Sequence, residues 1–368
     1  MTRPSGKPIG IKDIARSLGV SIGTVDRALH GRAGIKPETR ARVLKAAETM
    51  GYRPNLAARY LKSGKQLRIS VQLPREIAFF FDAIRQGIRD AAGPFQPALQ
   101  LIFRDHPRLA EGDLVLFDEA LADRTSGIIV APGHPAEAEP YIRKAANAGI
   151  PVVCVATDAP GSERLTAITP DAFINGAIVG ELLSRFMGGT GRVAVITGDL
   201  STVDHAEKLN GFRHSLAAVG SNLEVAAVVE AHDDEHEAYR QTQALLARQP
   251  RFGGIYVSTA NSLPVLQAIE ESGQSGSIAV ITTDLFSDLV PFLRDRKVLA
   301  TIHQRPLTQG RMAFEALYRF LAEKVTPAPR VRLAPHIVMA SNLELFLDHA
   351  RAETERNETA LVAGREVP

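Results

Sequence analysis

The chain has 368 residues, 45% of them hydrophobic, which is enough to form the cores of two or three domains. It holds no apolar run of about 18 residues and no apolar leader, so we expect neither a membrane-spanning nor an exported protein. Residues 1–65 hold 14 basic and 4 acidic side chains, whereas the remainder holds 29 and 37, so a polyanion is the expected partner of the N-terminal part. The single cysteine, Cys154, cannot form an internal disulfide, which fits a cytoplasmic protein.

The basic N-terminal part is predicted to begin with two short helices. The segment IKDIARSL, residues 11–18, places its apolar side chains on one helical face, and Ser21 can cap a second helix that ends near residue 29. Ala15, Gly19 and Val25 stand at the spacing that lets two helices cross closely around a tight turn. This spacing predicts a helix-turn-helix.

A third helix is expected between Pro37, which suits a first helical turn, and Gly51, which ends the helix. With it, the stretch IKDIARSLGVSIGTVDRALHGRAGIKPETRARVLKAAETMGYRPNLAARYLKSG resembles the DNA-binding head of the lactose-repressor (LacI) type of bacterial transcription regulators. The resemblance runs through the head without gaps. It implies that the helix starting at Ser21 enters the major groove of double-stranded operator DNA.

The resemblance also gives the residues of this recognition helix individual roles. Ser21 and Thr24 would donate hydrogen bonds to phosphates, and Ile22 would touch a thymine methyl. Arg27 would bind guanine O6 and N7 as a fork, with a solvated helical charge as the alternative. Asp26 would accept a hydrogen bond from a cytosine N4 or, as a polar surface residue, orient Arg27.

The stretch YRPNLAARYLKSG matches the hinge helix of this family, which orders on operator DNA. The resemblance implies a helix from Asn55 to about Leu61, with two copies from a homodimer in the minor groove. Leu61 would wedge between base pairs and kink the duplex, while Ala58 would let the two helices pack. Arg53 and Arg59 would contact phosphates. The alternative is that Leu61 is only a linker residue.

From residue 67 onward, short apolar runs alternate with helical patterns, which predicts an α/β body with parallel sheets. The expected strands are 67–73, 98–103, 127–131, 151–156, 192–197, 224–230, 253–258, 278–283 and 298–303. A break near residues 169–180 divides them into two lobes, and this body resembles the periplasmic sugar-binding fold.

The expected domains are a helix-turn-helix head (1–54), a hinge helix and linker (55–66), a two-lobed ligand-binding and dimerisation domain (67–345) and a polar flexible tail (346–368). Lobe 1 is expected at about 67–170 and 302–328, and lobe 2 at about 171–301 and 329–345.

Ligands of such folds bind beyond the carboxyl ends of the strands, so residues at those ends are the candidates for a pocket. By resemblance, aromatic residues would stack on a sugar ring and polar residues would bind its hydroxyls, although Ala156 replaces an acid and Lys208 an arginine of the family. The candidates are Phe80, Phe81, Thr157, Asp158, His205, Lys208, Ser258, Asn261, Asp284 and Gln304. At least one aromatic residue of Phe79, Phe80 and Phe81 is expected in the pocket.

These features predict a ligand-responsive transcription regulator, with repression as its expected role, that binds a palindromic operator as a homodimer and senses a sugar, a polyol or a related metabolite. The alternative is a stand-alone carbohydrate-binding protein. No motif of a hydrolase, a P-loop enzyme or a dinucleotide-binding enzyme is present, so we expect no enzyme, no cofactor and no membrane partner. His232 and His236 are read as a solvated helix start and not as metal ligands. Whether ligand releases DNA or promotes its binding is left open.

Overall fold

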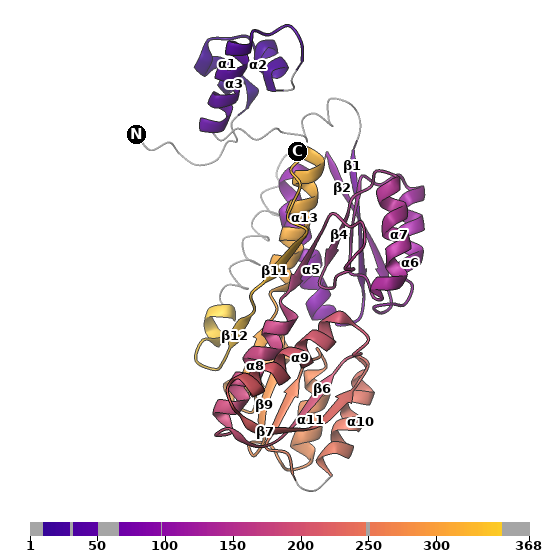
Figure 1. Ribbon diagram of the computed structural model, residues 1–368, viewed down its shortest axis with the longest axis vertical. Coiled ribbons are helices and arrows are strands. Elements are labelled where there is room, and N and C mark those ends of the chain that lie inside the picture. The colour runs from indigo at the N-terminus through magenta and orange to yellow at the C-terminus, as the bar shows by residue number, and fades with distance from the viewer. Residues whose placement is uncertain (1–9, 30–31, 51–65, 97, 248–250, 348–368) are drawn as a thin grey trace, which may run out of the picture. The chain divides into compact units, whose positions relative to one another are not determined.

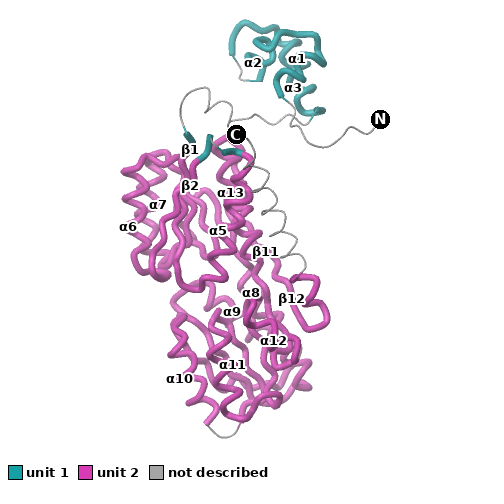
Figure 2. The backbone as a smooth tube through the Cα atoms, turned by 180° about the vertical axis from the view of Figure 1, so that it is seen from behind, with its two compact units in different colours: residues 1–67, 95–99 teal, residues 68–94, 100–368 magenta. Residues whose placement is uncertain are grey.

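The computed structural model describes residues 10–29, 32–50, 66–96, 98–247 and 251–347 (Figure 1). The chain divides into two compact units, one of residues 1–67 with 95–99 and one of residues 68–94 with 100–368 (Figure 2). Among the described residues, no helix is both long enough and apolar enough to cross a lipid bilayer.

The N-terminal unit contains the three predicted helices, α1 (Ile11–Leu18), α2 (Ile22–Leu29) and α3 (Pro37–Thr49). One side chain from each helix, Ile14, Val25 and Val43, is completely buried in a shared core. Gly19 ends α1 with φ of 65°, a left-handed conformation that glycine adopts without steric cost. The Ser21 hydroxyl accepts the Thr24 N–H at 3.1 Å, so it caps α2 as predicted.

The first lobe of the larger unit is built on a six-stranded sheet in the order β11-β5-β4-β3-β1-β2. Its strands are β1 (Leu67–Pro74), β2 (Leu99–His106), β3 (Gly127–Val130), β4 (Val152–Val155), β5 (Thr166–Pro170) and β11 (Arg330–Leu333). Its helices are α5 (Ala78–Ala92), η1 (Gly93–Phe95), α6 (Asp113–Ala122), α7 (Pro135–Asn147) and α13 (Pro306–Glu323). The helices α6 and α7 cover one face of the sheet, and α5 and α13 cover the other (Figure 1).

The second lobe repeats this plan with the strand order β12-β10-β9-β8-β6-β7. Its strands are β6 (Thr190–Thr197), β7 (Asn222–Glu230), β8 (Gly254–Val257), β9 (Ala279–Thr283), β10 (Ala300–His303) and β12 (His336–Val338). Its helices are α8 (Ala172–Phe186), α9 (Val203–Ala218), α10 (Glu235–Leu246), α11 (Ser262–Glu271), η2 (Ser287–Leu289) and α12 (Val290–Arg294). Alternate residues of β6 pack against α8 and α9 on one face and against α10 and α11 on the other, as expected for a parallel strand buried on both sides.

Helices α8 and α9 approach each other at glycines. A Cβ atom added at Gly176 would lie 1.8 Å from the carbonyl oxygen of Lys208, and one added at Gly211 would lie 1.9 Å from that of Phe173. The absence of side chains at these two positions therefore lets α9, which carries Lys208, lie directly against α8.

The chain passes between the lobes three times, after β5, after β10 and after β11. This topology corrects two expected boundaries. Residues 302–303 belong to β10 in the second lobe, and β11 belongs to the first lobe, where it pairs in parallel with β5. The tail was expected to begin at residue 346, but Phe346 and Leu347 pack against the core of the second lobe.

All nine expected strands are present, and the α/β class is confirmed. The strands β5, β11 and β12 were not predicted. These strands have five, four and three residues, and two of them, β11 and β12, lie at the edges of their sheets. The strands β5 (TAITP) and β11 (RVRL) mix polar with apolar residues and β12 (HIV) has only three residues, so none of them forms a continuous apolar run like that of the four-residue β4 (VVCV).

Candidate functional site

The exposed surface of α2 carries the residues that were assigned to DNA. Ser21, Ile22 and Arg27 are exposed, and the Ile22 side chain keeps 50% of its accessible surface. The Ser21 and Thr24 hydroxyls are hydrogen-bonded to each other at 2.8 Å. The start of α2 thus presents a hydroxyl pair and an apolar side chain, with a guanidinium one to two turns further along the helix.

Asp26 has a partner other than the predicted Arg27. Its carboxylate pairs with the Arg32 guanidinium at 3.2 Å, and Arg32 follows α2 in the chain. Arg53, Asn55, Ala58, Arg59 and Leu61, the residues assigned to the hinge helix, lie outside the described residues.

A cavity with about 570 Å³ of free space, partly open to solvent, lies between the two lobes. The first lobe and its link to the second contribute a face that we call the apolar wall, which consists of Ile77, Phe80, Phe81, Leu109, Ala156, Thr157 and Pro170. The second lobe contributes a face that we call the polar wall, which consists of Thr202, Asp204, His205, Lys208, Asp233, Ala260, Thr283, Asp284 and Gln304. Most of these residues stand at strand ends or in the first turn of a following helix, as the parallel topology requires.

Asp284, directly after β9, is held rigidly by Gln304, directly after β10. One carboxylate oxygen accepts the Gln304 N–H at 3.1 Å and the other accepts the Gln304 side-chain amide at 2.7 Å. Asn175 of α8 in turn donates to the Gln304 side-chain oxygen at 3.2 Å. Burial raises the pKa of Asp284 to about 6, against the opposing effects of the Lys208 charge and of the Gln304 hydrogen bonds.

Lys208 is almost completely buried and forms an ion pair with Asp204, one turn earlier on α9. The Lys208 Nζ atom lies 2.5 Å from the Asp204 carboxylate and 3.4 Å from the carbonyl oxygen of Ser258. The cation is thereby neutralised before any ligand binds.

A second acid–base pair consists of Asp233 and His205. The Nε2 atom of His205 lies 3.4 Å from the Asp233 carboxylate, whose other oxygen accepts the Thr259 hydroxyl. Burial acts to raise the pKa of Asp233, but the hydrogen bond and charge of His205, together with the Thr259 hydroxyl, outweigh it and lower this pKa to about 2. Asp233 is therefore ionised at neutral pH.

Seven of the ten predicted pocket residues line this cavity: Phe80, Phe81, Thr157, His205, Lys208, Asp284 and Gln304. Phe79 instead is partly exposed and stacks on Phe286, with ring centroids 4.2 Å apart. Ser258 and Asn261 are buried after β8 but are not among the described residues that line the cavity.

Asp158 lines a neighbouring cavity with Thr157 and Asp171. Its carboxylate is bound by both Nε and Nη2 of Arg164 and lies 3.4 Å from Arg330 of β11. These two arginines already neutralise Asp158, so we assign it to the packing of the first lobe.

Asp204 and Asp233 line the cavity but were not predicted to do so. Asp204 could have been found, because it stands four residues before Lys208 on the same helix, a spacing that brings two side chains together. Asp233 follows the end of β7 as Asp284 follows the end of β9, but it stands in an acidic stretch that was read as a solvated helix start. His232 and His236 of that stretch are indeed exposed.

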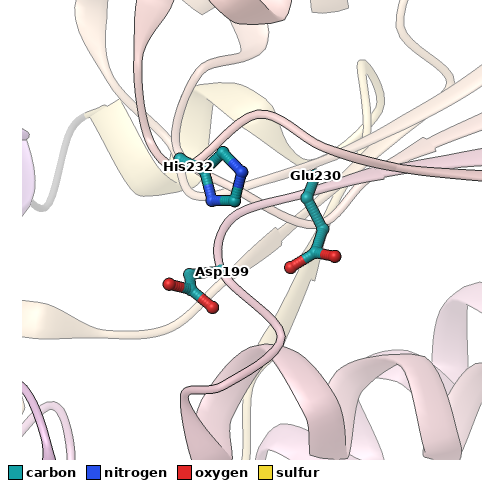
Figure 3. Close-up of side chains that lie close together, drawn as sticks. All are labelled: Asp199, Glu230 and His232. Carbon is teal, nitrogen blue, oxygen red and sulfur yellow. The ribbon is translucent and has the colours of Figure 1, made fainter.

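His232 lies beside Asp199 and Glu230, and one nitrogen or oxygen atom of each lies within 4.8 Å of the others (Figure 3). Asp199 accepts the Ser201 N–H at 2.7 Å, and Glu230 accepts the Leu200 N–H at 2.9 Å. Hydrogen bonds to the loop after β6 account for the positions of both carboxylates, and we assign the group no ligand.

Two family profiles match the chain. "Bacterial regulatory proteins, lacI family" matches residues 10–55, and "Periplasmic binding protein domain" matches residues 69–324. Together they span the helix-turn-helix and most of both lobes, up to the end of α13.

Similar curated proteins extend over about three quarters of the chain or more. Catabolite control protein A of Priestia megaterium is 25% identical over 89% of this chain and 97% of its own. The HTH-type transcriptional regulator AglR of Rhizobium meliloti (strain 1021) is 28% identical over 86% and 87%, and the maltose regulon regulatory protein MalI of Escherichia coli (strain K12) is 25% identical over 74% and 79%.

Among solved structures, an ABC transporter solute-binding protein from Burkholderia graminis C4D1M, in complex with D-arabinose, is similar with a TM-score of 0.70. It is 21% identical and covers 76% of this chain and 97% of its own. A solute-binding protein from Bacillus halodurans C-125 with bound myo-inositol has the same TM-score and coverage at 17% identity. These likenesses establish the fold of the two lobes.

Proposed function

Because the chain belongs to the lacI family of bacterial regulatory proteins and its body is a periplasmic-binding-protein domain, we propose that it is a transcription regulator that responds to a sugar or sugar-like metabolite. The metabolite would bind in the cavity between the lobes. Its binding would change the affinity of the helix-turn-helix for operator DNA. Both the sensor and the DNA-binding roles agree with the names of the relatives.

The arrangement of Asp284 is the observation that carries the sensor role. Each of its carboxylate oxygens accepts one hydrogen bond from Gln304, which leaves further lone pairs free to accept hydrogen bonds. Two vicinal hydroxyls of a polyol match two such oxygens. The aromatic rings of Phe80 and Phe81 on the apolar wall suit the C–H face of a sugar ring.

The DNA-binding role rests on α2. We infer that Ser21 and Thr24 bind phosphates, that Ile22 contacts a thymine methyl and that Arg27 reads a guanine. Arg53, Asn55, Ala58, Arg59 and Leu61 are proposed to form the minor-groove part of the interface. A homodimer would place two such heads on a palindromic operator, with repression as the proposed outcome.

The proposed coupling is a shift between two populations of the two-lobed body. The chain crosses between the lobes at three places, so a ligand that contacts both walls favours one relative position of the lobes. DNA affinity would follow, because the segment that comes after the head leads directly into the first strand of the first lobe. Ligand and DNA must then influence each other by the same factor.

The test uses the full-length protein. Sugars and polyols are screened by thermal shift, and each hit is titrated by calorimetry before operator binding is measured with and without it. The variant Asp284→Asn should weaken a hit about tenfold or more, because a charge-assisted hydrogen bond becomes a neutral one. Asp288→Asn, the same change at an exposed position four residues away, should not.

Specific DNA binding separates the proposal from its alternative. Arg27→Ala should weaken binding to the operator more than to unrelated DNA. A protein that binds sugars but shows equal affinity for all duplexes would be a carbohydrate-binding protein without a regulatory role. Full retention of ligand binding in Asp284→Asn would refute the assignment of the cavity.

A further inference from the structure

The two walls of the interlobe cavity differ in chemistry. On the apolar wall, Thr157 has the one polar side chain among the described lining residues, and its hydroxyl donates to the carbonyl oxygen of Pro132 at 2.7 Å. The described part of this wall therefore offers a ligand no free side-chain N–H or O–H group.

The main chain of the apolar wall does not supply the missing donors. Apart from Ile77, each residue of the wall either has its N–H hydrogen-bonded within the protein or, like Pro170, has none. The bonds run from Phe80 and Phe81 to the Ile77 carbonyl oxygen (2.9 and 3.2 Å), from Leu109 to the Glu76 carboxylate (2.6 Å), from Ala156 to the Ile168 carbonyl oxygen (3.2 Å) and from Thr157 to the Val155 carbonyl oxygen (2.8 Å).

The polar wall is the opposite. It presents the carboxylates of Asp204, Asp233 and Asp284, the Lys208 ammonium and the Gln304 amide, all at least partly buried. Every strongly polar side chain that reaches the cavity thus comes from one side.

A hexose that binds the polar wall through its vicinal ring hydroxyls and turns its C5 edge toward the apolar wall would press its exocyclic hydroxyl against that wall. A hydroxyl buried there would lose its hydrogen bonds to water and find almost no donor in return. A methyl group or a ring edge without oxygen would instead bury apolar surface against Phe80, Phe81 and Leu109.

From this asymmetry we infer that the effector is a 6-deoxyhexose, a sugar that keeps its ring hydroxyls but has a methyl group in place of the exocyclic hydroxymethyl group, so that its C5 edge carries no hydroxyl. Its vicinal hydroxyls bind the polar wall at Asp284, and its methyl group lies against the apolar wall. The inference rests on the proposed function and adds the class of the ligand.

Matched pairs of sugars test it on the full-length protein. Calorimetric titrations compare L-fucose with L-galactose, D-fucose with D-galactose, L-rhamnose with L-mannose and 6-deoxy-D-glucose with D-glucose. In the pair with the correct stereochemistry, the deoxy sugar should bind roughly tenfold to a hundredfold more tightly, the range by which an apolar pocket rejects an added hydroxyl.

A variant of the apolar wall tests the same inference with whichever pair of sugars binds. Ala156 has φ of 67°, a conformation that asparagine adopts more readily than alanine, so Ala156→Asn should fold while adding an amide to the apolar wall. It should narrow or reverse the preference for the deoxy sugar. Ala110→Asn is the matched control, because Ala110 also has a positive φ of 63° but is not among the described lining residues.

Different results would overturn the 6-deoxyhexose inference and the proposed regulator function. Tighter binding of the parent hexose, equal binding within each pair, or no binding by any of the eight sugars overturns the 6-deoxyhexose. The regulator itself is refuted only if the screen yields no sugar or polyol at all, or if no specific operator binding is found with the same preparation.

Discussion

The ion pair between Lys208 and Asp204 should make Lys208→Met strongly destabilising, although methionine has a similar length. The Lys208 and Asp204 side chains are only 3% and 18% exposed, and the two charges lie 2.5 Å apart. Removal of the cation leaves Asp204 without its partner in a cavity that already holds the carboxylates of Asp233 and Asp284. Loss of one partner of a buried pair typically costs about 3–5 kcal/mol.

The partial exposure of Asp204 places the expected loss near the lower value, about 3 kcal/mol. For a domain of this size, each kcal/mol lowers the melting temperature by about 2–4 °C, so the variant should melt at least about 6 °C lower. Urea unfolding of the ligand-free protein, followed by circular dichroism, measures the change in the free energy of unfolding directly.

Two further variants isolate the pair. The double variant with Asp204→Asn and Lys208→Met should lose less stability than Lys208→Met alone, because no unpaired charge remains. Arg185→Met breaks an exposed pair with Glu181 on α8 and should cost less than about 1 kcal/mol. If Lys208→Met costs no more than Arg185→Met, or if the double variant is the less stable of the two, the buried pair is not what stabilises α9 in this position.

Two other predictions concern helix packing and pH. Gly176→Ala should severely destabilise the protein in urea unfolding, because the added Cβ would lie 1.8 Å from the Lys208 carbonyl oxygen. The control Gly93→Ala should change the free energy of unfolding little, because nothing lies within 4 Å of a Cβ at that position. Equal losses of stability in the two variants would contradict the close approach of α8 and α9. The raised pKa of Asp284, about 6, means that the folded state binds its proton more tightly than the unfolded chain does. Stability contributed by this proton is present below the unfolded value of 3.8 and is lost as the pH rises through about 6. Asp284→Asn should therefore gain stability relative to the wild type between pH 4 and pH 7, and a constant difference between the two would show that Asp284 does not titrate in this range.

The parts of the fold that could be predicted are those encoded by neighbouring residues. Gly19, Ser21 and Pro37 begin or end helices through their own backbone or side-chain chemistry, so the head was predicted closely. Strands such as β4 and β8 are continuous apolar runs and are recognisable for the same reason. By contrast, β11 reads as alternating Arg330, Val331, Arg332 and Leu333, and its pairing with β5 joins segments more than 160 residues apart.

The residues of the candidate site likewise divide into those that the local sequence reveals and those that only the packed structure brings together. Asp284 and Gln304 were identified because each directly follows an apolar strand. Asp158 also follows a strand, yet Arg330 from a distant edge strand helps to hold its carboxylate, which no local pattern reveals. Asp233 likewise follows the end of β7 and His205 lies in the first turn of α9, so only the folded second lobe brings the two side chains together.

The triple crossing between the lobes also bears on the order in which the chain can fold as it leaves the ribosome. Residues 172–303 build the helices and five of the six strands of the second lobe before the first lobe receives α13 and β11. Until residue 333 has been made, β5 has no neighbour on its outer side, and an unpaired strand edge invites pairing with other chains. The edge of β5 is complete at residue 170 and waits until residue 333 for β11, whereas the edge of β10 in the second lobe is complete at residue 303 and waits only until residue 338 for β12. The nascent first lobe is therefore exposed to aggregation for longer, and a chain that stops before Arg330 would keep both edges open permanently.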